Sequence, residues 1–267
     1  MKTKKTFRTW WWVSKTSAAL VLVVSASAQW MNYPTPGIPR TPDGKPNLSA
    51  PAPRTEDGKP DLSGLWQPAS GGADKQFLDI AGEIKGGLPF QPWAADIVKA
   101  RRAAENKDDP DGHCQPLGLV KMHLHPYPRR MVQVPGLTLI LFERDTNYRQ
   151  IFTDGRPLPA DPNPSWNGYS SAKWDGDTLV VETVGFRDGL WLDTGGSPLT
   201  DAAKVTEKFR RVNYGTMEID LTVDDAKAYT KPWSIKVKQI LAPDTELLDY
   251  ICLENERDVK HLPTTTP

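Results

Sequence analysis

The sequence lacks the features that would tie its main part to a membrane or to nucleic acid. Beyond residue 28, no apolar run approaches the ~20 residues that a membrane-spanning helix needs. There is also no basic surplus. Residues 1–28 hold five Lys and Arg and no acid, which leaves 28 basic against 33 acidic residues, a charge of −5, in the rest. We therefore expect a soluble mature protein with no membrane span and no nucleic-acid partner.

The common catalytic motifs are absent as well. The chain has no phosphate-binding loop, no dinucleotide-binding glycine pattern, no Gly-x-Ser-x-Gly and no His-Glu-x-x-His. Nucleotide-dependent enzymes, many serine hydrolases and zinc proteases depend on these motifs to place backbone amides, a nucleophile or metal ligands. Their absence argues against those classes, and we predict no cofactor.

Cysteine is scarce, with only Cys114 and Cys252 in 267 residues. In an oxidising compartment, one pair of cysteines predicts one disulfide. It would close a loop of over a hundred residues and contribute ~4 kcal/mol in the chain-entropy model. The alternative is a nucleophilic Cys114 beside His113, which is disfavoured because a free reactive thiol survives poorly outside the cytoplasm.

The first 28 residues have the pattern of a signal peptide. A basic start precedes a short apolar run from Ala18 to Val24, and Ala26 and Ala28 provide the small residues that signal peptidase requires. The alternative is an uncleaved N-terminal anchor. We therefore expect an exported protein, either periplasmic or secreted, from which residues 1–28 are removed.

A proline-rich arm or linker is predicted over residues 29–62. The stretch 39–49 recurs almost unchanged as 53–63, at a spacing of 14 residues. Proline and Asp-Gly turns exclude a helix here, and the segment has little apolar surface to bury. We expect the first copy to be a linker. After the arm, we expect a single β domain over residues 63–258 and a disordered tail over residues 259–267.

One helix and a series of strands are predicted inside that domain. Pro92 suits the first turn of a helix over 92–106, whose apolar residues fall on one face. From residue 130 onward, the hydrophobic period is two. We expect strands at Trp66 and over 131–134, 137–142, 148–152, 171–174, 178–186, 204–212, 216–223, 233–241 and 246–253. Short links join antiparallel neighbours, and closing such a meander removes its exposed edges. The sequence thus predicts a mainly β fold, a closed antiparallel barrel, with a β-sandwich as the alternative.

Four segments carry a resemblance to known proteins: 57–66 (DGKPDLSGLW), 151–159 (IFTDGRPLP), 174–183 (WDGDTLVVET) and 228–233 (AYTKPW). Together they resemble a family of exported bacterial proteins to which no activity is attached, over roughly residues 53–258. Separately, the strand plan is similar to the lipocalin-type barrels, whose cavities take small, often apolar ligands. That similarity concerns architecture only, and a fold does not fix a function.

Aromatic and basic residues provide the first set of candidate ligand-binding residues. Trp166, Tyr169, Trp191 and Trp233 would offer large contact areas with a polar edge, although they could equally fill the core. Arg156 lies in a predicted turn beside the mouth of the barrel. It belongs to a group of arginines around the first strands that could hold an anion or pair with neighbouring acids: Arg129, Arg130, Arg144, Arg149 and Arg156.

Histidines and acids provide the second set. His123 and His125 form a His-x-His pair, which on an extended segment puts both rings on one side and can bind a metal, although both could be ordinary loop residues. Glu182 and Glu254 stand out because each lies in an otherwise apolar predicted strand. Any inward-facing pair of acids could do acid–base work, and the wider set of candidates is Glu182, Asp193, Glu207, Asp220, Asp249 and Glu254.

Three functions are compatible with these observations. The favoured one is an exported β-barrel that binds a small organic ligand in an aromatic and Arg-lined cavity. The second is a barrel enzyme, a lyase, isomerase or hydrolase, that acts on a small-molecule substrate through His, Tyr and carboxylate groups, with or without a metal. The third is an interaction protein of the cell envelope that uses the arm as a tether.

Overall fold

The computed structural model describes residues 33–69 and 78–254. The predicted signal peptide (1–28) and the predicted tail (259–267) lie outside these ranges. None of the helices in the described ranges is both long enough and apolar enough to cross a membrane.

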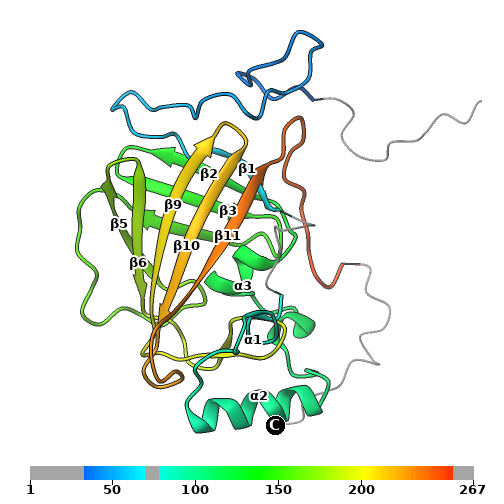
Figure 1. The fold of residues 1–267 in the computed structure, drawn as a ribbon, viewed down its shortest axis with the longest axis vertical. Coiled ribbons are helices and arrows are strands. Elements are labelled where there is room, and N and C mark those ends of the chain that lie inside the picture. Colours follow the sequence, from blue (N-terminus) through cyan, green and yellow to red (C-terminus); the bar gives the residue numbers. More distant parts are fainter. Residues whose placement is uncertain (1–32, 70–77, 255–267) are drawn as a thin grey trace, which may run out of the picture. The chain divides into compact units, whose positions relative to one another are not determined.

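The fold is a closed barrel of nine strands, as Figure 1 shows. In order around the ring, the strands are β1 (Gly64–Pro68), β11 (Trp233–Leu241), β10 (Thr216–Asp224), β9 (Lys204–Asn213), β6 (Thr178–Val184), β5 (Tyr169–Asp175), β4 (Tyr148–Phe152), β3 (Leu137–Phe142) and β2 (Arg129–Val134). The predicted mainly β barrel is confirmed, and the sandwich alternative is not the fold. The lipocalin-type plan has eight strands, so the strand number differs.

Two neighbours in the ring run parallel, whereas all other pairs are antiparallel. β4 pairs with β5 through two residue pairs only, Ile151 with Ser170 and Phe152 with Ser171. By contrast, β9 and β10 pair along nine residues. The barrel wall is therefore joined by only a short ladder between β4 and β5.

Strict alternation along the strands decides what fills the barrel. In β9, Val205, Glu207, Phe209 and Arg211 are buried, and the residues between them are partly or fully exposed. Side chains two apart in a strand share a face. A strand of this pattern therefore sends two charged side chains inward, and these need partners inside the barrel.

The predicted strand over 246–253 is wrong. The segment has no strand, only an isolated bridge between Arg144 and Tyr250. β11 already has β10 on one side and β1 on the other, because Trp66 pairs with Leu241 as the barrel closes. No edge is left on β11 for a further strand.

Helices close one end of the barrel (Figure 1). All six residues of α3 (Leu119–Leu124) are buried. The remaining elements at this end are α1 (Ile80–Glu83), α2 (Pro92–Ala103), the 3-10 helix η1 (Pro110–His113), β7 (Leu190–Trp191) and β8 (Pro198–Leu199). The predicted helix over 92–106 is confirmed as α2, which ends three residues early because Glu105 and Asn106 adopt positive φ angles of 56° and 54°.

The arm, residues 33–62, lies against the other end of the barrel (Figure 1). Each copy of the repeat is fastened by an Arg to an Asp in a loop at this end. Arg40 pairs with Asp244, which follows β11, at 2.7 Å. Arg54 pairs with Asp177, in the β5–β6 hairpin, at 2.6 Å. The first copy, which we expected to be a linker, therefore contacts the barrel in the same way as the second.

The repeat encodes one compact turn twice. In each copy, a Thr hydroxyl donates to a carbonyl oxygen four residues later, and the Arg guanidinium donates to the carbonyl oxygen of the turn glycine. The pairs are Thr41 to Lys45, Thr55 to Lys59, Arg40 to Gly44 and Arg54 to Gly58. The repetition in sequence is thus a repetition of one docking turn.

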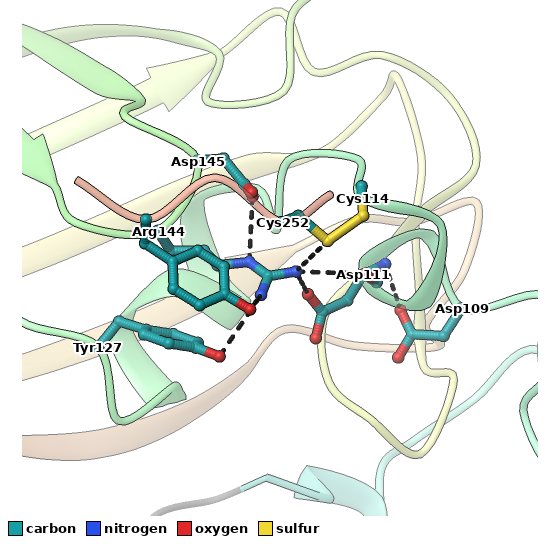
Figure 2. Close-up of a disulfide and its surroundings, with 8 residues drawn as sticks. Asp109, Asp111, Cys114, Tyr127, Arg144, Asp145 and Cys252 are labelled. Atoms are coloured by element: carbon teal, nitrogen blue, oxygen red, sulfur yellow. Dashed lines mark hydrogen bonds and ion pairs between the residues drawn. A yellow bond between two sulfur atoms is a disulfide. The ribbon is translucent and has the colours of Figure 1, made fainter. Parts of the chain in front are cut away.

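The predicted disulfide between Cys114 and Cys252 is confirmed, and it indicates an oxidising compartment. It joins the segment after η1 to the C-terminal segment. Figure 2 shows the Arg144 guanidinium beside it, where it donates to the Tyr250 hydroxyl at 2.7 Å and contacts the Asp111 carboxylate. The bridge and this arginine together hold the C-terminal segment against the helical end of the barrel.

Candidate functional site

A cleft of about 430 Å³ opens where β4 and β5 stop pairing. The ladder to β5 covers Ile151 and Phe152, so the first three residues of β4 have no strand partner on that side. In place of a ladder, the Asn167 side chain donates to the Tyr148 carbonyl oxygen at 3.2 Å. The cleft is thus an interruption in the barrel wall.

Aromatic rings and side-chain amides line this cleft. Phe152 and Tyr169 stack with their ring centroids 5.2 Å apart, and Trp166 and the 58% exposed Tyr148 add two further rings. The amides come from Asn147, Gln150 and Asn167. The buried Oδ1 of Asn167 finds no hydrogen-bond partner in the protein. Aromatic walls with a few polar groups are typical of small-molecule sites.

A buried ion pair lies behind the cleft. Arg149, which lines the cleft, donates to both carboxylate oxygens of Glu207, from Nη1 at 3.0 Å and from Nη2 at 2.5 Å. Ser170 and Thr183 accept further hydrogen bonds from the same guanidinium at 3.0–3.1 Å. Both charged side chains are almost fully buried. Their charges therefore neutralise each other, and the cleft itself gains little net charge from Arg149.

His123 extends this network from α3 into the barrel. Its Nε2 lies 2.7 Å from the Glu207 carboxylate, and its Nδ1 lies 3.3 Å from Arg129 Nη1. Because arginine only donates, Nδ1 accepts and Nε2 carries the proton. Burial lowers the pKa of His123. Both ring nitrogens are engaged, so this histidine joins α3 to the barrel wall rather than facing the cleft.

Glu207 is the negative centre of the network. Burial alone would raise its pKa, but the Arg149 charge and the His123 hydrogen bond outweigh burial and lower the pKa to about 2. Arg129 has no carboxylate partner and donates to the carbonyl oxygens of His125 and Tyr127. Burial lowers the pKa of Arg129 to about 9, so it stays protonated at neutral pH. The network of His123, Arg129, Arg149 and Glu207 therefore holds one more positive charge than negative.

The structure brings two of the predicted ligand-binding residues together. Trp166 and Tyr169 both line the cleft. Arg156 lies next to it: its guanidinium pairs with Asp154 and lies 3.9 Å from the centroid of the Phe152 ring. Arg156 thus contacts a cleft residue but is not among the residues that line the cleft.

The other two predicted tryptophans lie in the core. Trp191, in β7, is 6% exposed, and the Arg101 guanidinium lies 4.3 Å from its ring centroid. Trp233, at the start of β11, is 8% exposed and packs edge-on against Tyr229 at 5.4 Å. We expected both to line a ligand-binding cavity. Instead, they fill space between the barrel and the elements at its helical end.

Of the predicted acids, Glu182 and Glu254 face outward, whereas Glu207 and Asp193 are fully buried. Glu182 is half exposed on the outer face of β6 and pairs with Lys204. Glu254 is exposed in the C-terminal segment, which has no strand to turn it inward. Neither is within the cleft lining.

The two histidines do not face one site. α3 ends at Leu124, so His123 lies on a helix, and the extended segment expected here begins only at His125. His125 stacks on Tyr127 with a centroid distance of 5.8 Å. Over residues 33–69 and 78–254, no three His, Cys, Asp or Glu side chains are arranged to hold a metal ion. A metal at this pair remains a prediction, without a third ligand in the described ranges.

Alternation in the strands is the signal that could have identified the network. Arg149 shares the buried face of its strand with Ile151, and Glu207 shares the buried face of its strand with Val205 and Phe209. Both charged residues were among the candidates, but each was one of several. Asn167 lies in a loop, where no pattern in the sequence predicts its contact with Tyr148.

The chain matches no model of a known protein family, and no curated protein is significantly similar to it.

Proposed function

We propose that this protein binds a small, uncharged, ring-containing organic molecule in the cleft between β4 and β5. The observation that carries the proposal is the interrupted barrel wall, which exposes aromatic rings and amides in a space of about 430 Å³. That volume lies within the range of ~300–1,000 Å³ that is usual for ligand sites. In keeping with its disulfide, the protein would act after export, in the periplasm or after release.

The lining favours a hydroxylated ring such as a sugar. The apolar face of such a ring can stack on Trp166 or Tyr169, while its hydroxyl groups bond to planar amides at its edge. Since Arg149 is already paired with Glu207, a strongly charged ligand would gain no free counter-charge from it.

The test uses protein that is exported with its own N-terminus and recovered from outside the cytoplasm. Native mass spectrometry reports any retained organic mass, and ligand-observed NMR with a panel of mono- and disaccharides measures weak binding. Trp166→Ala should weaken binding by about tenfold or more, because it removes a stacking surface. Tyr148→Ala should weaken it by a smaller factor.

Tyr33 provides a matched control, since it is 57% exposed, close to the value for Tyr148, and lies outside the cleft. Tyr33→Ala should leave binding unchanged. Equal losses of ligand affinity in the Tyr33 and Tyr148 variants would contradict the proposed cleft. So would an affinity that Trp166→Ala leaves unchanged.

A further inference from the structure

A second cavity, of about 670 Å³, lies at the arm end of the barrel. One side consists of arm residues 54–57. The other side consists of the β2–β3 hairpin, Thr153 after β4, and Trp174 near the end of β5. The cavity shares no lining residue with the cleft between β4 and β5. It is therefore a separate space.

The part of the arm over this cavity, residues 51–59, is a strap held firmly only beyond its two ends. On one side, the Tyr214 amide donates to the Ala50 carbonyl oxygen at 2.8 Å. On the other, the Leu62 amide donates to the Gln133 side chain at 3.0 Å. The backbone hydrogen bonds of the strap itself, such as Thr55 N to Lys59 O, stay within the repeat.

Exposed contacts fasten the middle of the strap. Arg54 pairs with Asp177 while both side chains are more than half exposed, and Lys59 Nζ donates to the Gly176 carbonyl oxygen at 3.3 Å. Exposed ion pairs contribute little to stability and are screened by salt. The strap can therefore lift from the cavity without disturbing the barrel.

The chemistry of the wall identifies the kind of ligand. The barrel side offers Trp174, Val134 and Pro135 as apolar surface and no ionised side chain. Thr153, also in this wall, is only partly buried and offers a hydroxyl group. On the strap, Arg54 and Asp57 are already engaged with Asp177 and Thr55.

We infer that this cavity is a second ligand site, which takes an uncharged aromatic molecule with one hydrogen-bonding group, and that the strap opens to admit it. The apolar wall and Trp174 bind the ring, and the hydroxyl of Thr153 bonds to the hydrogen-bonding group of the ligand. A carboxylate on the ligand would lie against a barrel wall that offers no opposite charge, next to the exposed Glu56 of the strap. Both features disfavour an anionic ligand.

The experiment measures the binding of 2-naphthol to the full mature protein by calorimetry and stopped-flow fluorescence, with 2-naphthoate as the anionic comparison. We expect 2-naphthol to bind at least tenfold more tightly than 2-naphthoate. Val134→Asp, which adds a charge to the rim, should weaken 2-naphthol binding by tenfold or more. Val134 is 45% exposed, so the variant should fold, and Val212→Asp, at 47% exposed on β9, is its matched control.

Opening of the strap is tested with the two copies of the repeat. Arg54→Ala should increase both the association and the dissociation rate of 2-naphthol about threefold or more. Arg40→Ala removes the equivalent ion pair of the first copy, away from this cavity, and should change neither rate. Equal effects of the two arginine variants would overturn the opening of the strap.

The two sites fail independently. Loss of 2-naphthol binding in Trp166→Ala but not in Val134→Asp would place the probe in the β4–β5 cleft and overturn the second site. No binding of 2-naphthol at all would also overturn it, and would leave the sugar-binding test of the cleft unaffected.

Discussion

At the scale of single residues, the barrel is unusual for the charge that it buries. Arg129, Arg149 and Glu207 form one buried network inside it, and within this network only Arg149 has a carboxylate partner. A buried ion pair adds little net stability, because desolvation offsets the attraction between the charges. Removing one partner nevertheless leaves an uncompensated charge and is strongly destabilising. Glu207 is therefore the residue whose loss the interior should tolerate least.

Replacing Glu207 by Gln should lower the free energy of unfolding by about 3–5 kcal/mol, because the buried Arg149 loses its only carboxylate partner. Urea unfolding at pH 7 measures this. Adding Arg149→Met to the same protein should recover part of the loss. A double variant that is less stable than the single one would contradict the charge argument.

The pH dependence of stability follows from the same carboxylate. The pKa of Glu207 is about 2 in the folded protein and 4.5 ordinarily. A lowered pKa contributes stability above the unfolded value, and this stability is lost as the pH falls through the folded value. Glu207 should thus contribute about 3 kcal/mol near neutral pH, which disappears between about pH 4.5 and pH 2. Glu207→Gln should remove this part of the acid transition.

His125 should behave differently from its neighbour. Burial lowers its pKa, and both of its ring nitrogens are buried without a hydrogen-bond partner. His125→Phe keeps the stacking on Tyr127, so we expect unchanged or higher stability at pH 7 and a smaller loss on acidification from pH 7 to pH 5. His123→Phe should destabilise, because Glu207 loses a donor. Thermal unfolding at several pH values separates the effects of the two substitutions. A loss of stability in His125→Phe at pH 7 would contradict the assignment of His125 as a buried side chain without a hydrogen-bond partner.

At the scale of elements, the strands were the predictable part. The period of two over 204–212 and 216–223 gives β9 and β10 almost to the residue, because one face meets the core and the other meets water. α3 was not predicted. It is only six residues long and buried on all sides, so it has no polar face to produce a helical period.

The arm shows why composition misleads for some elements. Its many prolines and glycines are typical of a linker, yet the two turns are docked by Arg40 and Arg54 onto loops of the barrel. The repetition itself carried the information, since the same residues recur around each Arg. What the sequence could not provide was the partner of each turn, because Asp244 and Asp177 lie more than a hundred residues away.

The candidate site was predictable only in part, for the same reason. The aromatic character of Trp166 and Tyr169 was visible in the sequence, but the cleft exists because two strands fail to pair along their length. Trp191 and Trp233 have the same composition signal and lie in the core. Long-range packing, rather than local preference, separates a binding tryptophan from a structural one.

At the scale of the whole molecule, the disulfide joins residues 138 apart in sequence. Replacing Cys114 and Cys252 by Ser should lower the free energy of unfolding by up to about 4–5 kcal/mol in the chain-entropy model, because the unfolded chain regains a long open loop. Urea unfolding with and without a reductant measures this. The reductant should destabilise the wild-type protein and leave the stability of the double variant unchanged. A wild-type protein whose free energy of unfolding is the same with and without reductant would contradict the prediction.

The parallel pairing of β4 and β5 has a consequence that goes beyond this cleft. Around a closed ring, the number of reversals of direction must be even, so nine strands cannot alternate throughout, and at least one junction joins two strands of the same sense. The chain meets this requirement with a connection from 153 to 168 and two residue pairs. A parallel junction is therefore required by the odd number of strands, whereas its position, its short ladder and the side chains beside it are particular to this sequence.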